Sequence, residues 1–247
     1  KIAQGRHSVK PLAALIPARG GSKGVLKKNI KKICDFPLIA YSIVACKMCK
    51  NIDRVIVSTD DPEIAEIASK YGAEIPFLRP RELARDSSTD LEVIRHLLNN
   101  IDVPEIAYIR PTTPLRDPVY MDFYIEEYYR NREEITSIRS MHELAESPYK
   151  FLQIKDGSCY GFFSDFKGIK DYTNLPRQIF PKAYHPNGYI DIIKKKTIEE
   201  GSTYGEKVFP VVTDFVTEID TVNQLKYLEY EMNNTSNSIL NELRKRN

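Results

Sequence analysis

The sequence has no long apolar run, few cysteines and no large excess of charge of one sign. None of its segments approaches the roughly 18 consecutive apolar residues that suggest a membrane-spanning helix. Residues 1–11 are polar and lack the apolar core of a secretory signal. These absences predict a cytoplasmic protein that has no membrane partner.

Charge and cysteine usage exclude two further classes. The 36 Lys and Arg residues nearly balance the 34 Asp and Glu residues, which leaves a net charge of +2. Nucleic-acid binders usually carry a clustered basic excess, so we expect no nucleic-acid partner. Cys46 and Cys49 have CxxC spacing without a second such pair or a nearby histidine ligand. We interpret them as two partly buried residues of one helix rather than as a metal or redox site.

Strand and helix patterns alternate from residue 12 to about 140. The predicted strands are 12–16, 54–59, 106–109 and 135–139, and the predicted helices are 38–50, 62–71, 91–100 and 118–130. This alternation predicts an α/β fold with a mainly parallel sheet covered on both faces, which is a three-layer, Rossmann-like arrangement. Ligands of such sheets bind beyond the carboxyl ends of the strands. The loops at 17–24, 58–61 and 110–116 should therefore line one crevice.

Residues 141–185 break the alternation, because two apolar runs flank Lys155-Asp156-Gly157, a hairpin-turn signal. We interpret this segment as an extended insertion in a single domain spanning 12–231. Strands at 187–193 and 207–212 and a helix at 221–231 complete that domain. Residues 1–11 and 232–247 are predicted to be polar tails.

The loop Arg19–Gly24 (RGGSKG) follows the first predicted strand. Its glycines let backbone N–H groups approach an anion closely, and its Arg and Lys add charge that suits phosphate. The glycine spacing fits neither a Walker A loop nor a dinucleotide fingerprint, which argues against an NAD-binding oxidoreductase. Farther along, Glu218 and Asp220 lie two residues apart, so in extended chain they point the same way. Together they form a plausible Mg²⁺ site, with Mn²⁺ as an alternative ion.

Several motifs in the same order and spacing resemble those of the acylneuraminate cytidylyltransferases, the CMP-sialic acid synthetases. The motifs are Leu15–Gly24 with Lys28-Asn29, Val57–Asp60, Arg79-Pro80, Glu82–Ala84, Pro111–Arg116, Pro176–Gln178, Pro186–Gly188 and Ile219-Asp220. The resemblance runs from about residue 12 to 231.

The resemblance implies a reaction and a set of site residues. CTP and a nine-carbon 2-keto-3-deoxy sugar acid would give the CMP-sugar and pyrophosphate. The residues implied for catalysis are Arg19, Lys28 and Asp220, with Asp220 and Glu218 as metal ligands. Those implied for CTP are Arg19, Gly20, Gly21, Ser22, Lys23, Asn29 and Arg79, with Ser87 and Thr89 from a hydroxyl cluster. Those implied for the sugar are Arg110, Thr112, Thr113, Arg116, Arg177, Gln178, His185 and Asn187. The resemblance also implies a homodimer, in which 141–185 is the dimerisation insertion and reaches toward the other subunit's site.

The sequence departs from the family's pattern at several of these positions. Arg110 stands where glutamine is common, His185 where arginine is common, and Asp90 where serine is usual. Leu26 replaces a usual proline, and Glu218 replaces an aspartate. We expect the first two changes to alter the sugar from ordinary N-acetylneuraminate to a legionaminate-like or other nine-carbon 2-keto acid.

Two alternatives remain open at this point. One is a cytidylyltransferase for an eight-carbon acid, ketodeoxyoctonate or its 8-amino form, against which the Pro111–Arg116 and Pro186–Gly188 motifs argue. The other is a non-catalytic nucleotide-binding relative, against which the presence of Arg19, Lys28 and Asp220 argues.

Overall fold

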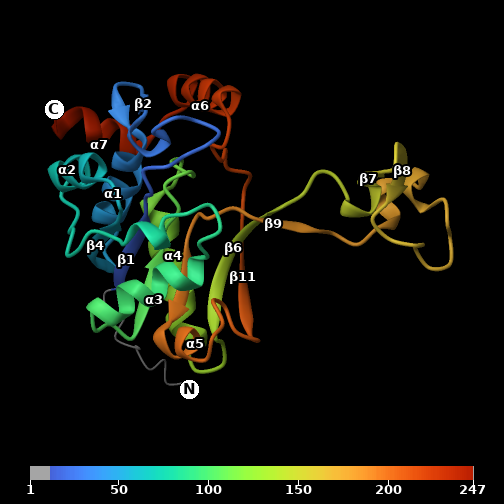
Figure 1. Cartoon of the computed structure of the whole chain (residues 1–247), viewed down its shortest axis with the longest axis horizontal. Coiled ribbons are helices and arrows are strands. Elements are labelled where there is room, and N and C mark those ends of the chain that lie inside the picture. Colours follow the sequence, from blue (N-terminus) through green and yellow to red (C-terminus); the bar gives the residue numbers. More distant parts are fainter. Residues whose placement is uncertain (1–11, 247) are drawn as a thin grey trace, which may run out of the picture.

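The computed structural model describes residues 12–246, so the predicted tail at 1–11 lies outside the described residues. Its centre is a seven-stranded sheet with the order β11-β6-β10-β5-β1-β4, and β9 pairs with β6 (Figure 1). The strands are β1 (Leu12–Pro17), β4 (Ile52–Ser58), β5 (Glu105–Tyr108), β6 (Ser137–Glu143), β9 (Tyr184–Pro186), β10 (Asp191–Lys194) and β11 (Val208–Thr213). The β4/β1, β1/β5 and β6/β11 pairs are parallel, and β10 runs antiparallel to both of its neighbours.

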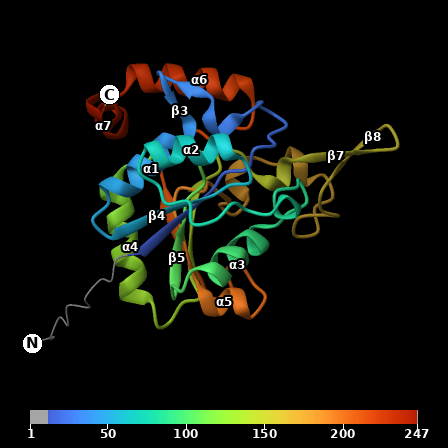
Figure 2. The ribbon, with the colours of Figure 1, turned by 60° about the vertical axis from the view of Figure 1, so that its left-hand side comes forward.

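Helices cover both faces of the sheet, as the alternating pattern predicted (Figures 1 and 2). The helices are α1 (Leu38–Met48), α2 (Pro62–Lys70), α3 (Asp90–Asn100), α4 (Pro118–Asn131), α5 (Lys195–Glu199), α6 (Val222–Asn234) and α7 (Ser238–Arg246). Successive side chains of β1 enter different cores, since Ala14 packs with α1 and α4 whereas Leu15 packs with α3 and α5. Two cores, one on each face of the sheet, make the three-layer α/β arrangement.

Local sequence signals explain where several helices begin. Asp61 caps α2 by accepting from the backbone N–H of Glu63, and Pro62 occupies the first helical turn. Thr89 and Glu92 form a capping box at the start of α3. Cys46 lies in α1 and Cys49 directly follows the helix, and both are buried rather than partly buried.

The carboxyl-terminal segment is not a polar tail. Residues 238–246 form α7, which buries Ile239, Leu240 and Leu243 in the core beside α1. The prediction for 232–247 was wrong because these three apolar residues are embedded in a strongly charged stretch. Among residues 12–246, no helix is long and apolar enough to span a membrane.

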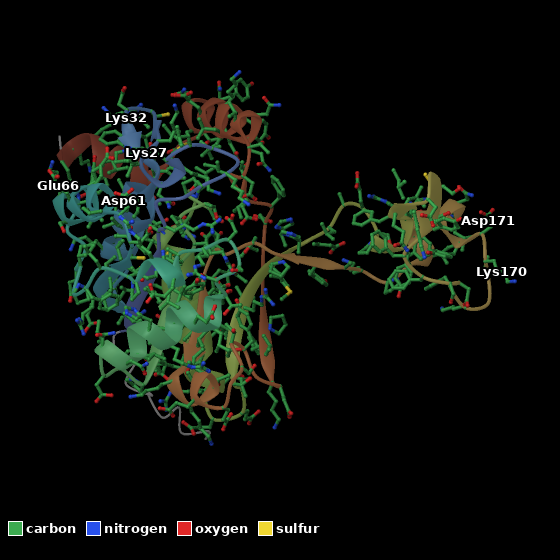
Figure 3. All side chains as sticks on the ribbon, viewed as in Figure 1. Lys27, Lys32, Asp61, Glu66, Lys170 and Asp171 are labelled. Atoms are coloured by element: carbon green, nitrogen blue, oxygen red, sulfur yellow. The ribbon has the colours of Figure 1, made fainter. Side chains whose placement is uncertain are left out.

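Residues 144–183 form an arm that projects from the body between β6 and β9 (Figure 1). The arm contains the hairpin of β7 (Leu152–Lys155) and β8 (Ser158–Gly161). Figure 3 places Lys170 and Asp171 near the far end of the arm. Stacked rings of Tyr149 and Phe180, 5.2 Å apart, hold its centre together. Many other apolar side chains of the arm are exposed, namely Phe151, Leu152, Ile154, Tyr160, Phe162, Phe163, Ile169 and Ile179. The predicted insertion is therefore a separate, sparsely packed projection.

Candidate functional site

A cavity of about 380 Å³ lies at the carboxyl ends of β1 and β5, where the fold predicts a ligand. It brings together predicted residues from four distant segments of the chain. Those that line it are Arg19, Ser22, Lys23, Lys28, Asn29, Arg79, Arg110, Thr112 and Asp220. The loop 58–61 supports this wall from behind, because Asp60 accepts from the backbone N–H of Gly20 at 3.0 Å.

Two cations of the loop Arg19–Gly24 converge on one carboxylate. Asp86 pairs with Arg19 at 2.8 Å and with Lys23 at 2.6 Å, through different oxygens. The hydrogen bond from Lys23, followed by the charges of Lys23 and Arg19, lowers the pKa of Asp86. Arg19 and Lys23 are thus spaced to hold two oxygens of one anionic group. Sequence reasoning did not assign Asp86, although it lies within the charged segment 79–90.

Lys28 and Asp220 form a second ion pair in the wall of the cavity. The Lys28 ammonium donates to the Ile219 carbonyl at 2.9 Å and to the Asp220 carboxylate at 3.0 Å. The Lys28 side chain is only 16% exposed, whereas that of Asp220 is 66% exposed. Gly24 packs on the same segment so closely that a Cβ there would lie 2.1 Å from the Asp220 carbonyl oxygen. Glycine at position 24 therefore sets the distance between the basic loop and Asp220.

Asn29 and Arg79 are buried polar side chains with unfilled hydrogen-bonding capacity. Asn29 donates to the Arg19 carbonyl at 3.0 Å, but its Oδ1 has no partner among the described residues. The Nε and one terminal nitrogen of Arg79 likewise have no partner there. Burial lowers the pKa of Arg79, and the nearby Asp60 opposes that effect. Both side chains line the cavity, and buried polar groups are nearly always satisfied, so a polar group bound there would complete their hydrogen bonds.

Arg110 and Asp90, two positions that depart from the family's pattern, form one ion pair. Asp90 is the first residue of α3, and its second oxygen accepts from the Tyr108 hydroxyl at 2.8 Å. All three side chains line the cavity. Arg110 is therefore not a free cation, which the sequence alone did not indicate.

Three residues predicted to contact the sugar are instead buried supports. Arg116 is 3% exposed, and its guanidinium donates to the Tyr189, Gly188, Thr113 and Arg110 carbonyls and to the Ser42 hydroxyl. Burial lowers the pKa of Arg116 to about 10, so the side chain remains charged at neutral pH.

Thr113 and Asn187 are also buried, and Thr113 donates to the Asn187 carbonyl at 2.7 Å. Asn187 in turn donates to the Thr213 hydroxyl at 2.7 Å. These two side chains are bonded to protein groups and do not line the cavity, so they hold its loops together.

Other predicted residues lie beside the cavity rather than in its wall. Gly20 and Gly21 are not among the lining residues, and Thr89 caps α3. Ser87 is exposed and does not line the cavity, whereas its neighbour Ser88 does, with its hydroxyl donating to the Glu82 carbonyl at 3.2 Å. Within one chain, Arg177, Gln178 and His185 do not line the cavity. Arg177 donates to the Ala145 carbonyl at 2.7 Å near the base of the arm, and His185 on β9 lies beside His142, with ring centroids 5.6 Å apart.

The exposed carboxylate of Asp220 suits a divalent cation whose other ligands are substrate phosphates. The described residues contain no group of three or more His, Cys, Asp or Glu side chains arranged for a metal ion. Asp220, however, is an exposed carboxylate on the cavity wall, and Mg²⁺ typically uses one or two carboxylates plus substrate phosphates. Glu218 accepts from the Thr112 hydroxyl at 3.4 Å and does not line the cavity. Burial, and then the charge of Asp220, raises the pKa of Glu218.

The comparison with known proteins agrees with this geometry. A family model described as cytidylyltransferase matches residues 13–233. The chain belongs to the cytidylyltransferase family. It is accordingly a nucleotidyltransferase, and the family prediction made from its motifs is confirmed.

Two relatives and one solved structure are similar to this cytidylyltransferase. It is 32% identical to the CMP-N,N'-diacetyllegionaminic acid synthase of Legionella pneumophila, over 85% of this chain and 91% of the relative. It is 34% identical to the N-acylneuraminate cytidylyltransferase of Escherichia coli O18:K1:H7 over 75% of this chain, but the match spans only 42% of that relative. The structure of CMP:2-keto-3-deoxy-manno-octonic acid synthetase complexed with CTP superposes with a TM-score of 0.66 at 15% identity, covering 91% and 98% of the two chains. At that identity the likeness supports the fold alone.

Proposed function

We propose that this cytidylyltransferase converts CTP and a nine-carbon 2-keto-3-deoxy sugar acid of the sialic or legionaminic type to the CMP-sugar and pyrophosphate. The observation that carries the proposal is one cavity that is lined by the cations Arg19, Lys23 and Lys28 and by the exposed carboxylate of Asp220. The names of the relatives that match along the chain supply the class of sugar.

The chain's own residues divide between binding and charge compensation. Asn29 and Arg79, with their unpartnered buried atoms, bind the nucleoside part of CTP. Arg19 and Lys23 release Asp86 and hold two phosphate oxygens in its place. The sugar's C2 hydroxyl oxygen attacks the α-phosphorus in line, the bond to pyrophosphate breaks on the opposite side, and the hydroxyl proton is released to solvent. Lys28 and the loop cations stabilise the charge that develops on the leaving group.

A divalent cation completes the site in this proposal. Asp220 would hold Mg²⁺ or Mn²⁺, with Glu218 as a second carboxylate two residues away. When bound, such an ion offsets phosphate charge and lowers the pKa of a hydroxyl that contacts it. Lys28, which pairs with Asp220 at 3.0 Å, is placed to turn toward phosphate when the ion takes that carboxylate.

A homodimer accounts for the arm. The exposed apolar side chains of residues 144–183 need a protein surface to cover them, and a second copy of the chain is the partner that the sequence predicts. In that assembly Arg177 and Gln178, which lie away from their own chain's cavity, contact the sugar in the partner's cavity. The cytoplasmic location stays a prediction from the sequence.

A pyrophosphate-release assay with a panel of sugar acids tests the activity. CTP with a nine-carbon acid and Mg²⁺ should give turnover, whereas ketodeoxyoctonate and the other nucleoside triphosphates should give little. Lys28→Ala should lower kcat about 100-fold or more with a smaller effect on the sugar KM, because one charge-stabilising donor is lost. Turnover only with an eight-carbon acid, or no metal-dependent turnover with any acid, would show that the proposal is wrong.

A further inference from the structure

Asp90 uses both of its carboxylate oxygens inside the cavity. One oxygen accepts from the Tyr108 hydroxyl at 2.8 Å, and the other pairs with a terminal nitrogen of Arg110. Tyr108 ends β5 and Arg110 follows two residues later, so the carboxylate bridges the helix α3 and the strand beneath it. The side chains of Asp90 and Arg110 are each about one-third exposed, which leaves part of the pair facing the cavity.

Arg110 is fixed by more than its ion pair. Its guanidinium carbon lies 5.5 Å from the centroid of the Tyr108 ring, within the range of a cation–π contact. Its aliphatic part lies against Gly188, where a Cβ would come within 2.5 Å of the Arg110 Cδ. Gly188 also has a φ of +62°, so the position favours glycine on two grounds. Asp90 and Tyr108 hold the guanidinium and Gly188 borders the aliphatic part, so the Arg110 side chain keeps one orientation.

The loop that carries Arg110 contacts the segment that carries Asp220. Two residues on, the Thr112 carbonyl accepts from the backbone N–H of Ile219 at 2.9 Å, and the Thr112 hydroxyl donates to Glu218. Arg110 therefore lies beside the segment that carries Asp220, whereas the two cations that hold Asp86, Arg19 and Lys23, belong to the loop Arg19–Gly24. A guanidinium has five N–H donors in a fixed fork, and Asp90 occupies only part of them.

We propose that Asp90 is a positioning residue for the sugar: it fixes Arg110 so that the remaining guanidinium donors hold a neutral acceptor, a hydroxyl or an acylamido carbonyl. The inference rests on the proposed function. Because Asp90 compensates the charge of Arg110, the pair selects a sugar group by the direction of the hydrogen bonds that it can accept. It does not select by electrostatic attraction for a carboxylate. Asp90 acts only through Arg110, so its loss matters only while Arg110 is present.

A double-mutant cycle tests this dependence in the full-length enzyme. The variants are Asp90→Ser, Arg110→Gln and the double variant, assayed with Mg²⁺ and the best sugar acid of the panel. We expect each single variant to raise the sugar KM about tenfold, or about 1.4 kcal/mol, with the CTP KM within about twofold of the wild type. The double variant should be no worse than Arg110→Gln alone, because contacting residues are not additive.

Asp102→Asn is the matched control, because Asp102 follows the other end of α3 and pairs with Lys195 at 3.0 Å while 98% exposed. It should leave both KM values unchanged, and melting temperatures identify a variant whose fold is damaged.

Additive effects in the double variant, or an equal rise in both KM values, would overturn the role of Asp90. A wild-type enzyme inactive with every sugar acid would refute the proposed function and this role with it. An active wild type with unresponsive variants would refute only the role of Asp90.

Discussion

Gly24→Ala should disable the enzyme without unfolding it. The added methyl carbon would lie 2.1 Å from the Asp220 carbonyl oxygen, whereas ordinary contact begins near 3.4 Å. The basic loop and the Asp220 segment must therefore separate by about 1 Å, and a displacement of that size between reacting groups costs on the order of 100-fold in rate. We expect kcat to fall about 100-fold, equivalent to about 2.7 kcal/mol in the activation barrier.

Gly21→Ala provides the comparison within the same loop. A Cβ at Gly21 would meet no atom within 4 Å, and alanine keeps the backbone N–H that an anion could use. We expect kcat within about threefold of the wild type, measured by pyrophosphate release at saturating CTP and sugar acid. Equal losses in the two variants would refute the reasoning, because they would show that the loop is sensitive to any side chain and not to its distance from Asp220.

Two further predictions concern stability. Arg116→Leu should lower the free energy of unfolding by more than about 3 kcal/mol, since it leaves several buried acceptors without a donor. Denaturant unfolding measures this loss, and a normal stability with an altered sugar preference would restore Arg116 to the sugar site. Burial, and then the charge of His185, lowers the pKa of His142. The contribution of neutral His142 to the free energy of unfolding is therefore complete above about pH 6.5 and is lost as the pH falls through the folded-state pKa. His142→Gln should therefore lose less stability than the wild type between about pH 7 and pH 5, and parallel pH profiles would contradict this assignment.

The sequence predicts the sheet and its helices well because their signals are local. The apolar run of β1 is buried along its length, and the Thr89–Glu92 spacing specifies the start of α3. Helix α7 was missed because Ile239, Leu240 and Leu243 are too few to stand out in a charged segment, and only the surface beside α1 makes their burial favourable.

Motifs locate a site more readily than they distinguish its lining from its supports. Arg110 and Arg116 belong to one loop, yet Arg110 faces the cavity and Arg116 is enclosed by carbonyl groups. The pairing of Asp90 with Arg110 joins residues that are 20 apart in the chain. No periodicity or spacing reports such a contact, because it depends on where α3 crosses the end of β5.

Three aspartates each hold at least one cation of the cavity in place. Asp86 bridges Arg19 and Lys23, Asp220 pairs with Lys28, and Asp90 pairs with Arg110. Charge–charge repulsion among unpaired cations would otherwise disfavour the arrangement that phosphate requires. The pairs differ in what a ligand can do to them, however. Asp86 is half-exposed and competes directly with an anion for its two cations, whereas Asp90 is also bonded to Tyr108. A triphosphate can therefore displace the first carboxylate while the second keeps its partner, which leaves Arg110 oriented for the sugar throughout the reaction.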